Sequence, residues 1–281
     1  MPAATTTELE RLLDDDVPHG DLTTEALGIG GEAGVMDFFA RDPMVLALAE
    51  DAAAILRLCG CEVEQLASSG ERLAAGAPIL RAHGAASGLL RGWKVAQTLI
   101  EIWSGVATAT REIVEAARAV SPGIAIACTR KNTPGTKRFA VAAVKAGGAV
   151  MHRLGLSETI LVFGEHRAFL DEPLAATVAR LRSAAPEKKL ITEVAAIDTA
   201  LAAAEAGFDV LQLEKFTPPD VATLIQRLAA TPHHPVIAVA GGVNASNAAA
   251  YAQAGAQVLV TSSPYMAKPR DVQVKIRRDT K

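Results

Sequence analysis

The sequence has little of the features that mark several specialised classes of protein. Of its 281 residues only 3 are cysteines and 4% are aromatic. No uninterrupted apolar run approaches the ~20 residues needed to cross a bilayer. Lys and Arg number 28 against 31 Asp and Glu, which gives a formal net charge of −3. This balance excludes a broad basic surface for nucleic acid, so any cationic site must be local.

The three cysteines, Cys59, Cys61 and Cys128, are an odd number without framework spacing, which is typical of a reducing compartment. Cys59 and Cys61 flank one glycine, and this pair has two interpretations. Zinc sites usually include a second Cys or His pair at a known spacing, and none follows here. A turn is therefore favoured over a metal site. The first residues also lack the basic and apolar regions of a signal peptide, so we expect a cytoplasmic protein.

The second half of the chain repeats one pattern, a short apolar run followed by an Ala-rich helical stretch. Buried strands that alternate with amphipathic helices predict βα units and a parallel sheet. So many repeats indicate a closed or nearly closed α/β barrel. The expected strands are residues 124–128, 160–163, 190–194, 210–213, 236–240 and 258–260, and the expected helices are 173–185, 197–206, 219–230 and 244–254.

The first half has a different pattern, which predicts a small α+β unit. Short strands are expected at residues 35–39, 63–66 and 78–81, with a helix over 45–58. A long helical stretch over 89–120 then leads to a Pro-Gly turn signal. We place the domain boundary inside this stretch, which gives an N-terminal domain of residues 1–110 and a barrel of residues 111–281. The last residues, 271–281, are charged and are free to return to the N-terminal domain.

Polar and glycine residues follow the apolar runs, where a barrel carries its active site. Gly241 and Gly242 precede the helix expected from Asn244, an arrangement typical of a phosphate loop because glycine lets backbone N–H groups approach an anion. Singly, each feature has a plain interpretation as a turn, a rim charge or a structural histidine. Together they favour a phosphate-handling enzyme. The residues at the strand ends are Thr129, Arg130, Lys131, His152, Arg153, Glu193, Glu214, Gly241, Gly242, Thr261, Ser262 and Ser263.

Several motifs resemble the quinolinate phosphoribosyltransferase family, the carboxylating nicotinate-nucleotide pyrophosphorylases. They are GDLTT at 20–24, SGVAT at 104–108, TRKNTPG at 129–135, AGGAVMHRLGLSET at 146–159 and AGG at 240–242. The resemblance implies an N-terminal α/β sandwich domain and a C-terminal open α/β barrel of about seven strands. It also implies a homodimer whose small domain closes the partner's barrel. The family transfers phosphoribosyl from phosphoribosyl pyrophosphate to quinolinate, with Mg²⁺ assisting and loss of carbon dioxide.

The resemblance also implies roles for individual residues. Arg130 and Arg153 would bind a substrate carboxylate, and Thr129, Lys131 and His152 would line the same pocket. Glu193 and Glu214 would hold Mg²⁺ or the ribose hydroxyls and stabilise positive charge on the sugar, while Lys131 would neutralise the departing pyrophosphate. No covalent nucleophile is needed. The 5′-phosphate would lie against Gly241, Gly242, Thr261, Ser262 and Ser263.

Four positions depart from the family pattern, among them Glu214, where the family usually has aspartate, and Val141, where it has a lysine. Lys94 stands where the family has an arginine that reaches in from the partner subunit, and Phe163 stands where it has a pocket lysine. With fewer cations for two carboxylates, we expect an acidic acceptor other than quinolinate. Trp93, Lys94 and Asn132 resemble a branch associated with molybdate-transport genes, which predicts a link to molybdenum uptake or cofactor handling. Two alternatives stay open, a genuine quinolinate enzyme of NAD biosynthesis and a non-catalytic ribose-phosphate-binding accessory protein.

Overall fold

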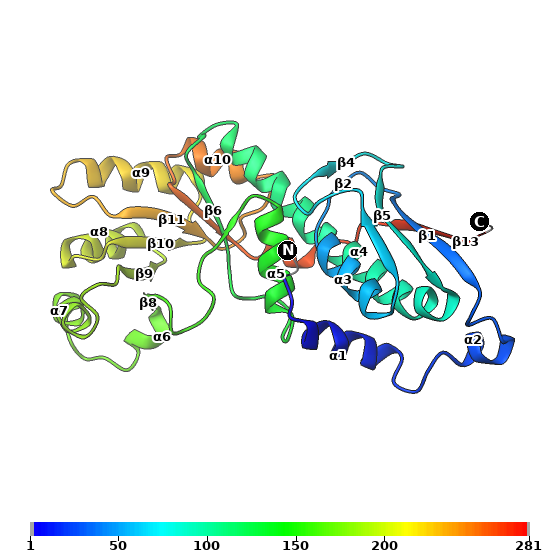
Figure 1. Cartoon of the computed structure of the whole chain (residues 1–281). Coiled ribbons are helices and arrows are strands. Elements are labelled where there is room, and N and C mark those ends of the chain that lie inside the picture. Colours follow the sequence, from blue (N-terminus) through cyan, green and yellow to red (C-terminus); the bar gives the residue numbers. More distant parts are fainter. Residues whose placement is uncertain (1–2, 280–281) are drawn as a thin grey trace. The chain divides into compact units, whose positions relative to one another are not determined.

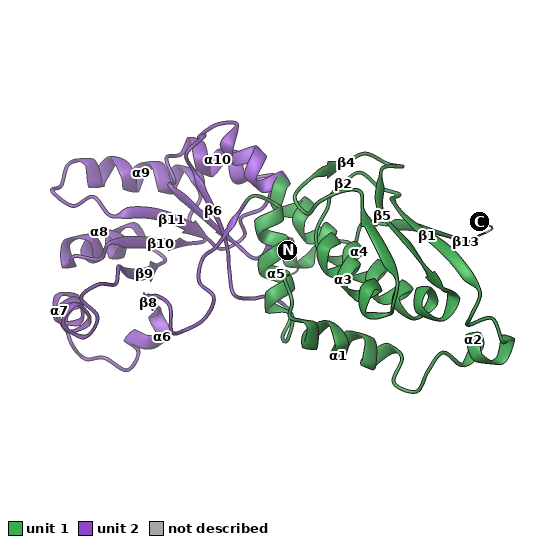
Figure 2. Ribbon diagram, viewed as in Figure 1, with its two compact units in different colours: residues 1–111, 133–148, 265–281 green, residues 112–132, 149–264 purple. Residues whose placement is uncertain are grey.

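The computed structural model describes residues 3–279, which form two compact units (Figure 2). Unit 1 contains the chain up to Arg111, residues Thr133–Gly148 and the chain from Tyr265 onward. Unit 2 contains Glu112–Asn132 and Ala149–Pro264, so the units interleave along the sequence. In the described part of the chain, no helix has both the length and the apolarity to cross a membrane.

Unit 1 is built on a four-stranded sheet in the order β13-β1-β5-β3 (Figure 1). All three pairings in it are antiparallel. Its core is apolar, and Met36, Phe38 and Ile55 are fully buried. This agrees with the expected α/β sandwich. The elements of unit 1 are α1 (Thr6–Asp16), α2 (Leu22–Leu27), β1 (Ala33–Ala40), β2 (Met44–Val45), α3 (Ala49–Leu58), β3 (Glu62–Gln65), β4 (Arg72–Leu73), β5 (Pro78–Ala85), most of α4 (Ala86–Arg118), α5 (Lys137–Ala146) and β13 (Val272–Arg278).

The helix expected over residues 45–58 is shorter than predicted. It begins at Ala49, because Met44 and Val45 pair with β4 instead and Leu48 takes a left-handed backbone conformation with φ 60°. At the other end the Cys-Gly-Cys segment is a turn, with Gly60 at φ 84° directly after the helix. Burial and the neighbouring Cys59 raise the pKa of Cys61 to about 11, so its thiol stays protonated at neutral pH.

Unit 2 is built on a seven-stranded sheet in the order β7-β6-β12-β11-β10-β9-β8. Strands β7 and β8 are its two edges, so the sheet is an open barrel, as the family resemblance implied, whereas the repeat pattern alone allowed either a closed or a nearly closed one. Helices α7 to α10 follow the strands as a row of neighbours. The elements are β6 (Ala125–Cys128), β7 (Val150–Met151), β8 (Ile160–Val162), α6 (Gly164–Arg167), α7 (Leu174–Ala184), β9 (Leu190–Val194), α8 (Ile197–Ala206), β10 (Val210–Glu214), α9 (Pro218–Ala229), β11 (Val236–Ala240), α10 (Ala248–Gln253), β12 (Val258–Thr261) and the short 3₁₀ helix η1 (Ser263–Met266).

Side chains on strand β10 alternate between the two faces of the sheet. Leu211 and Leu213 are fully buried on one face, while Gln212 and Glu214 share the other. The parallel register places Gln212 beside Glu193 of β9 and Ala238 of β11. Polar side chains therefore gather on β9 and β10, next to small apolar ones on β11.

The sheet of unit 1 contains a buried carboxylate between two arginines. Asp37 on β1, with 7% of its side chain exposed, accepts a hydrogen bond from Arg81 on β5 at 2.6 Å and another from Arg277 on β13. Burial alone would raise the pKa of Asp37, but the two guanidinium groups outweigh it and hold the pKa below its ordinary value. Asp37 thus links the C-terminal strand to the centre of the sheet.

We expect Asp37→Asn to lower the free energy of unfolding by about 1–3 kcal/mol at neutral pH, the usual range for hydrogen bonds to charged groups. Because the folded-state pKa is depressed, this stabilisation is present above the unfolded pKa of ~3.9 and is lost as the pH falls through the folded value. Denaturant unfolding at several pH values measures both effects.

The matched control is Glu32→Gln, since Glu32 pairs with Arg278 at 2.9 Å on the exposed surface of the same unit. That variant should change the free energy of unfolding by less than about 0.5 kcal/mol. Equal effects of the two substitutions would contradict a special role for Asp37.

Candidate active site

A cavity of about 940 Å³ lies in unit 2 where the parallel strands end. Carboxyl ends of parallel strands meet at one edge of a sheet, which is where α/β proteins bind their ligands. Every site residue predicted in unit 2 lines this cavity. They are Thr129, Arg130, Lys131, His152, Arg153, Phe163, Glu193, Glu214, Gly241, Gly242, Thr261, Ser262 and Ser263.

The glycine loop after β11 presents three consecutive backbone donors. Gly241 and Gly242 have φ values of +85° and +91°, which only glycine adopts readily. A Cβ on Gly241 would lie 2.8 Å from the backbone nitrogen of Lys215. In the described part of the chain, no hydrogen bond uses the N–H of Gly241, Gly242 or Val243. Such a run of N–H groups beside a cavity is suited to an anion.

The helix expected from Asn244 begins four residues later, at Ala248, so that prediction is wrong. Asn244 and Asn247 instead use their side chains to hold the loop, since both donate to the carbonyl oxygen of Gly242 at 3.0 Å. The side chain of Asn244 also accepts from the backbone N–H of Ser246 at 2.9 Å. Asparagine side chains compete with helix formation in this way. The backbone N–H groups at this side of the cavity therefore come from the loop itself and not from a helix N-terminus.

Two arginines make one side of the cavity positive. Arg153 is only 6% exposed, and the influences that lower its pKa are burial and the charge of Arg130. No carboxylate pairs with Arg153 among residues 3–279, which leaves a buried cation without a counter-ion. A buried charge needs a partner. Burial and Arg153 also lower the pKa of His152, so its imidazole is neutral at neutral pH.

Phe163 gives the cavity an aromatic wall. Its ring lies 5.5 Å from the guanidinium carbon of Arg153 and is stacked on His166, with ring centroids 5.7 Å apart. The backbone N–H of Phe163 donates to Nδ1 of His166 at 3.0 Å, which fixes the start of α6. The half-buried ring therefore faces the cavity and the arginine, and does not enter the barrel core.

Two carboxylates, Glu193 and Glu214, lie at the ends of adjacent strands. Burial raises the pKa of Glu193, a hydrogen bond from Gln212 opposes this, and the charge of Glu214 adds to the rise. The described residues contain no cluster of three His, Cys, Asp or Glu side chains that could hold a metal by itself. Two carboxylates suit Mg²⁺, which keeps several waters and usually takes other ligands from substrate phosphates.

The hydroxyl cluster after β12 is partly used by the protein itself. Thr261, 3% exposed, donates its hydroxyl to the carbonyl oxygen of Val243 at 2.6 Å and accepts from the backbone N–H of Ser263 at 3.1 Å. The hydrogen bond from Thr261 to Val243 therefore helps to fix the end of the glycine loop. Ser262 and Ser263 are more exposed at the cavity wall.

The cavity lining also contains residues that were not predicted as site residues, among them Gln212 and Lys215. Gln212 could have been found from the period of β10, because it is two residues before Glu214 and so shares its face. Lys215 has a φ of +58°, an uncommon value for a residue other than glycine, and its side chain lies against Gly241. Sequence alone gave no sign of that conformation.

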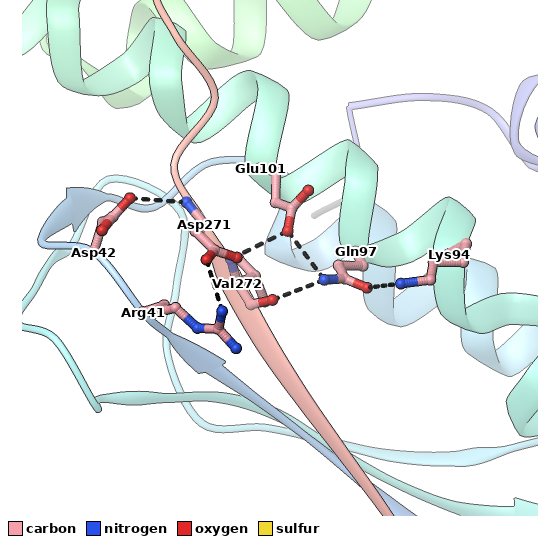
Figure 3. Close-up of polar contacts among 7 residues, drawn as sticks. All are labelled: Arg41, Asp42, Lys94, Gln97, Glu101, Asp271 and Val272. Carbon is pink, nitrogen blue, oxygen red and sulfur yellow. Dashed lines mark hydrogen bonds and ion pairs between the residues drawn. The ribbon is translucent and has the colours of Figure 1, made fainter.

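Lys94 belongs to unit 1, so its relation to the cavity stays a prediction. Its ammonium group lies 4.1 Å from the ring centroid of Trp93 and donates to Gln97 at 3.1 Å (Figure 3). Gln97 in turn donates to Glu101 and to the carbonyl oxygen of Val272, at 3.0 and 2.7 Å. The exposed lysine is thus held by a chain of polar contacts along α4 and β13.

Known proteins are similar to this chain over nearly its whole length. A Rhodobacter capsulatus protein named "Putative pyrophosphorylase ModD" is 49% identical over 86% of this chain and 94% of its own length. A Methanothermobacter thermautotrophicus protein named "Probable nicotinate-nucleotide pyrophosphorylase (carboxylating)" is 32% identical over 96% and 98%. The crystal structure of NadC from Streptococcus pyogenes superposes with a TM-score of 0.89 at 25% identity, covering 97% of this chain and 96% of that one.

Both halves of the sequence also match one family. Residues 21–104 match the N-terminal domain of quinolinate phosphoribosyl transferase, and residues 106–275 match its C-terminal domain. Together with the open seven-stranded sheet and the cavity at its strand ends, these matches show that the chain belongs to the quinolinate phosphoribosyl transferase family.

Proposed function

We propose that this protein transfers the phosphoribosyl group of phosphoribosyl pyrophosphate to an acidic acceptor. The observation that carries the proposal is the composition of one cavity, in which unpaired backbone donors, a buried unpaired arginine and two carboxylates occur together. A glycosyltransferase, as its family relatives are, needs donors to bind the phosphate, a positive charge to bind an acidic acceptor, and carboxylates to stabilise the sugar.

The 5′-phosphate would bind the loop from Gly241 to Val243, where the N–H groups have no partner within the described residues. Lys215, whose side chain contacts Gly241, would add a positive charge at this end. Donors that are fixed before binding cost little reorganisation, so the loop would anchor the sugar in one orientation.

Transfer would proceed through an oxocarbenium-like sugar. Glu193 and Glu214 would stabilise its positive charge, because both are fixed at strand ends and Glu193 is held by Gln212. Lys131, whose charge acts on Glu193, would neutralise the departing pyrophosphate. Mg²⁺ held by the two carboxylates and the substrate would supply further neutralisation of that leaving group.

The acceptor would lie on the arginine side of the cavity. Arg153 and Arg130 provide positive charge for a carboxylate, and Phe163 provides a flat apolar surface for a ring. This composition favours a ring with one carboxylate over the dianion quinolinate.

The two other hypotheses have less support. A non-catalytic binding protein needs no carboxylates beside its phosphate site, whereas this cavity has two. A role in NAD biosynthesis requires quinolinate as acceptor. Phe163 disfavours quinolinate, because it offers no positive charge for the second carboxylate. The link to molybdenum uptake or cofactor handling rests on the resemblance to one branch of the family.

We expect Gly241→Ala to reduce the affinity for inorganic phosphate about tenfold or more. The new methyl group would meet the backbone of Lys215 and strain a φ of +85°, so the N–H groups would shift. Isothermal titration calorimetry measures the affinity.

Gly207→Ala is the matched control, since Gly207 has a φ of +97° at the end of α8 but lies outside the cavity. It should lower stability by a similar strain and leave phosphate binding unchanged. Phosphate binding that survives Gly241→Ala would show that the loop is not the anion site.

The reaction itself is tested by pyrophosphate release from phosphoribosyl pyrophosphate with Mg²⁺ and a panel of acidic heterocycles. We expect turnover with at least one acceptor, and a kcat/KM for quinolinate below about 10⁴ M⁻¹ s⁻¹. Phe163→Lys should raise the quinolinate value about tenfold or more by supplying a charge for the second carboxylate. Phe163→Leu, which removes the ring without adding a charge, should not.

Absence of turnover with every acceptor would favour the non-catalytic hypothesis. Quinolinate turnover in the ordinary enzyme range by the wild type would instead support the role in NAD biosynthesis and contradict the interpretation of Phe163.

Lys94 is expected to act across a dimer interface. Lys94→Ala should reduce kcat/KM about tenfold or more, whereas Lys275→Ala, which removes another lysine placed over an aromatic ring of unit 1, should not. Mixing the Lys94→Ala and Lys131→Ala proteins should restore about one quarter of wild-type activity, because half of randomly mixed dimers are heterodimers with one intact site. A monomer in light scattering, or no recovery on mixing, would contradict this arrangement.

A further inference from the structure

In the side-chain amide of Gln212 the nitrogen is hydrogen-bonded and the oxygen is not. The residue is 5% exposed and lines the cavity. Its Nε2 donates to Oε2 of Glu193 at 2.8 Å. Its Oε1 is buried and has no hydrogen-bond partner among residues 3–279. Buried polar atoms are nearly always paired, so an unpaired one beside a cavity indicates a missing partner.

The orientation of this amide is fixed by chemistry. An ionised carboxylate has no donor, so it can be bonded by the amide nitrogen and not by the amide oxygen. Rotating the amide by half a turn would set Oε1 against the oxygens of Glu193. Gln212 therefore cannot satisfy Oε1 by turning towards its neighbour on β9.

The other neighbours supply no donor either. On β11 the residue beside Gln212 is Ala238, which has only a methyl group, and the next residue on the same face of β10 is Glu214, a carboxylate. Leu211 and Leu213 are fully buried on the opposite face. The donor that pairs with Oε1 must come from the cavity.

The chemistry of an acceptor excludes some ligand groups. Phosphate and carboxylate oxygens have no proton to give in their anionic forms, so Oε1 repels them, whereas a hydroxyl can donate to it. Gln212 is in register with Ala238, three residues before the glycine loop starts at Gly241, which places it about 10 Å along the strand from that loop. A sugar whose phosphate lies on that loop extends towards Gln212.

We propose that Oε1 of Gln212 accepts a hydrogen bond from a ring hydroxyl of the bound ribose phosphate, and that Gln212 is therefore a residue that determines sugar specificity. The same amide holds Glu193 through Nε2, so one side chain connects recognition of the sugar to the orientation of a carboxylate. That the ligand is a ribose phosphate rests on the proposed function. That Oε1 of Gln212 lacks a partner is a feature of the structure and is independent of that proposal.

The test compares four probes on the wild-type protein by calorimetry: inorganic phosphate, ribose 5-phosphate, and the 2-deoxy and 3-deoxy analogues of ribose 5-phosphate. The wild type should bind ribose 5-phosphate about five- to tenfold more tightly than the analogue that lacks the recognised hydroxyl. Gln212→Met, which keeps length and volume and removes the amide, should abolish that difference and leave the affinity for inorganic phosphate unchanged.

Glu193→Leu separates recognition from support, because leucine removes the carboxylate and adds no donor that could pair with Oε1. If Oε1 binds the hydroxyl itself, this variant keeps the preference for the hydroxylated sugar, although kcat falls. If Gln212 acts only by holding Glu193, Glu193→Leu and Gln212→Met lose the same preference, and the proposal is overturned.

Failure of the inference and failure of the proposed function give different results. A wild type that binds neither phosphate nor ribose 5-phosphate refutes the proposed function, and the sugar assignment with it. A wild type that binds ribose 5-phosphate without discriminating against either deoxy analogue refutes only the role of Gln212, and this measurement needs no variant to fold. An equal loss of phosphate and ribose 5-phosphate affinity in Gln212→Met would also overturn it, since that indicates a structural role.

Discussion

The buried guanidinium of Arg153 has no counter-ion within the described residues, and the rest of the site depends on this constraint. A cation in this position is unfavourable until an anion arrives. The residues beside Arg153 do not neutralise its charge. Arg130 adds a second positive charge, and the lowered pKa of His152 keeps that imidazole neutral. The ring of Phe163 contacts the guanidinium by a cation–π interaction, which stabilises the charge without cancelling it.

The glycine loop of the same cavity also has polar groups without a partner among the described residues. The glycine loop offers N–H groups whose positions are fixed by Asn244, Asn247 and Thr261. Glu193 and Glu214 line the same cavity from neighbouring strands, and the charge of Glu214 helps to raise the pKa of Glu193. The cavity therefore combines two carboxylates with two arginines and a loop of backbone N–H groups, a composition that suits a substrate with both cationic and anionic parts.

Much of unit 2 could be predicted from the sequence, because its strands are short apolar runs bounded by Gly, Pro and polar residues. All six of the apolar runs expected there became strands of one sheet. Openness of the barrel could not be read from the repeat alone, since closure depends on which edge strands pair. The start of α10 was missed because Asn244 and Asn247 bond to the loop, an outcome that propensity does not encode.

Site residues were predictable where they followed a strand and less so elsewhere. Glu193 and Glu214 were found because they end apolar runs, while Gln212 was missed because it lies within one. Lys215 was missed because its role depends on a backbone angle. In unit 1 the C-terminal stretch was expected to be charged and free to return to the N-terminal domain, but no strand was predicted there, although its Val-Gln-Val-Lys-Ile pattern has the period of a strand and forms β13 beside β1.

The pairing of β13 with β1 has a consequence for synthesis on the ribosome. β1 ends at Ala40 and its partner begins at Val272, so the edge of β1 that faces β13 stays unpaired until almost the whole chain has been made. All seven strands of unit 2 lie before that point and can assemble first. The unit that contains the first residues is thus the last to be completed, and a chain cut short before Val272 would expose an open strand edge to other chains.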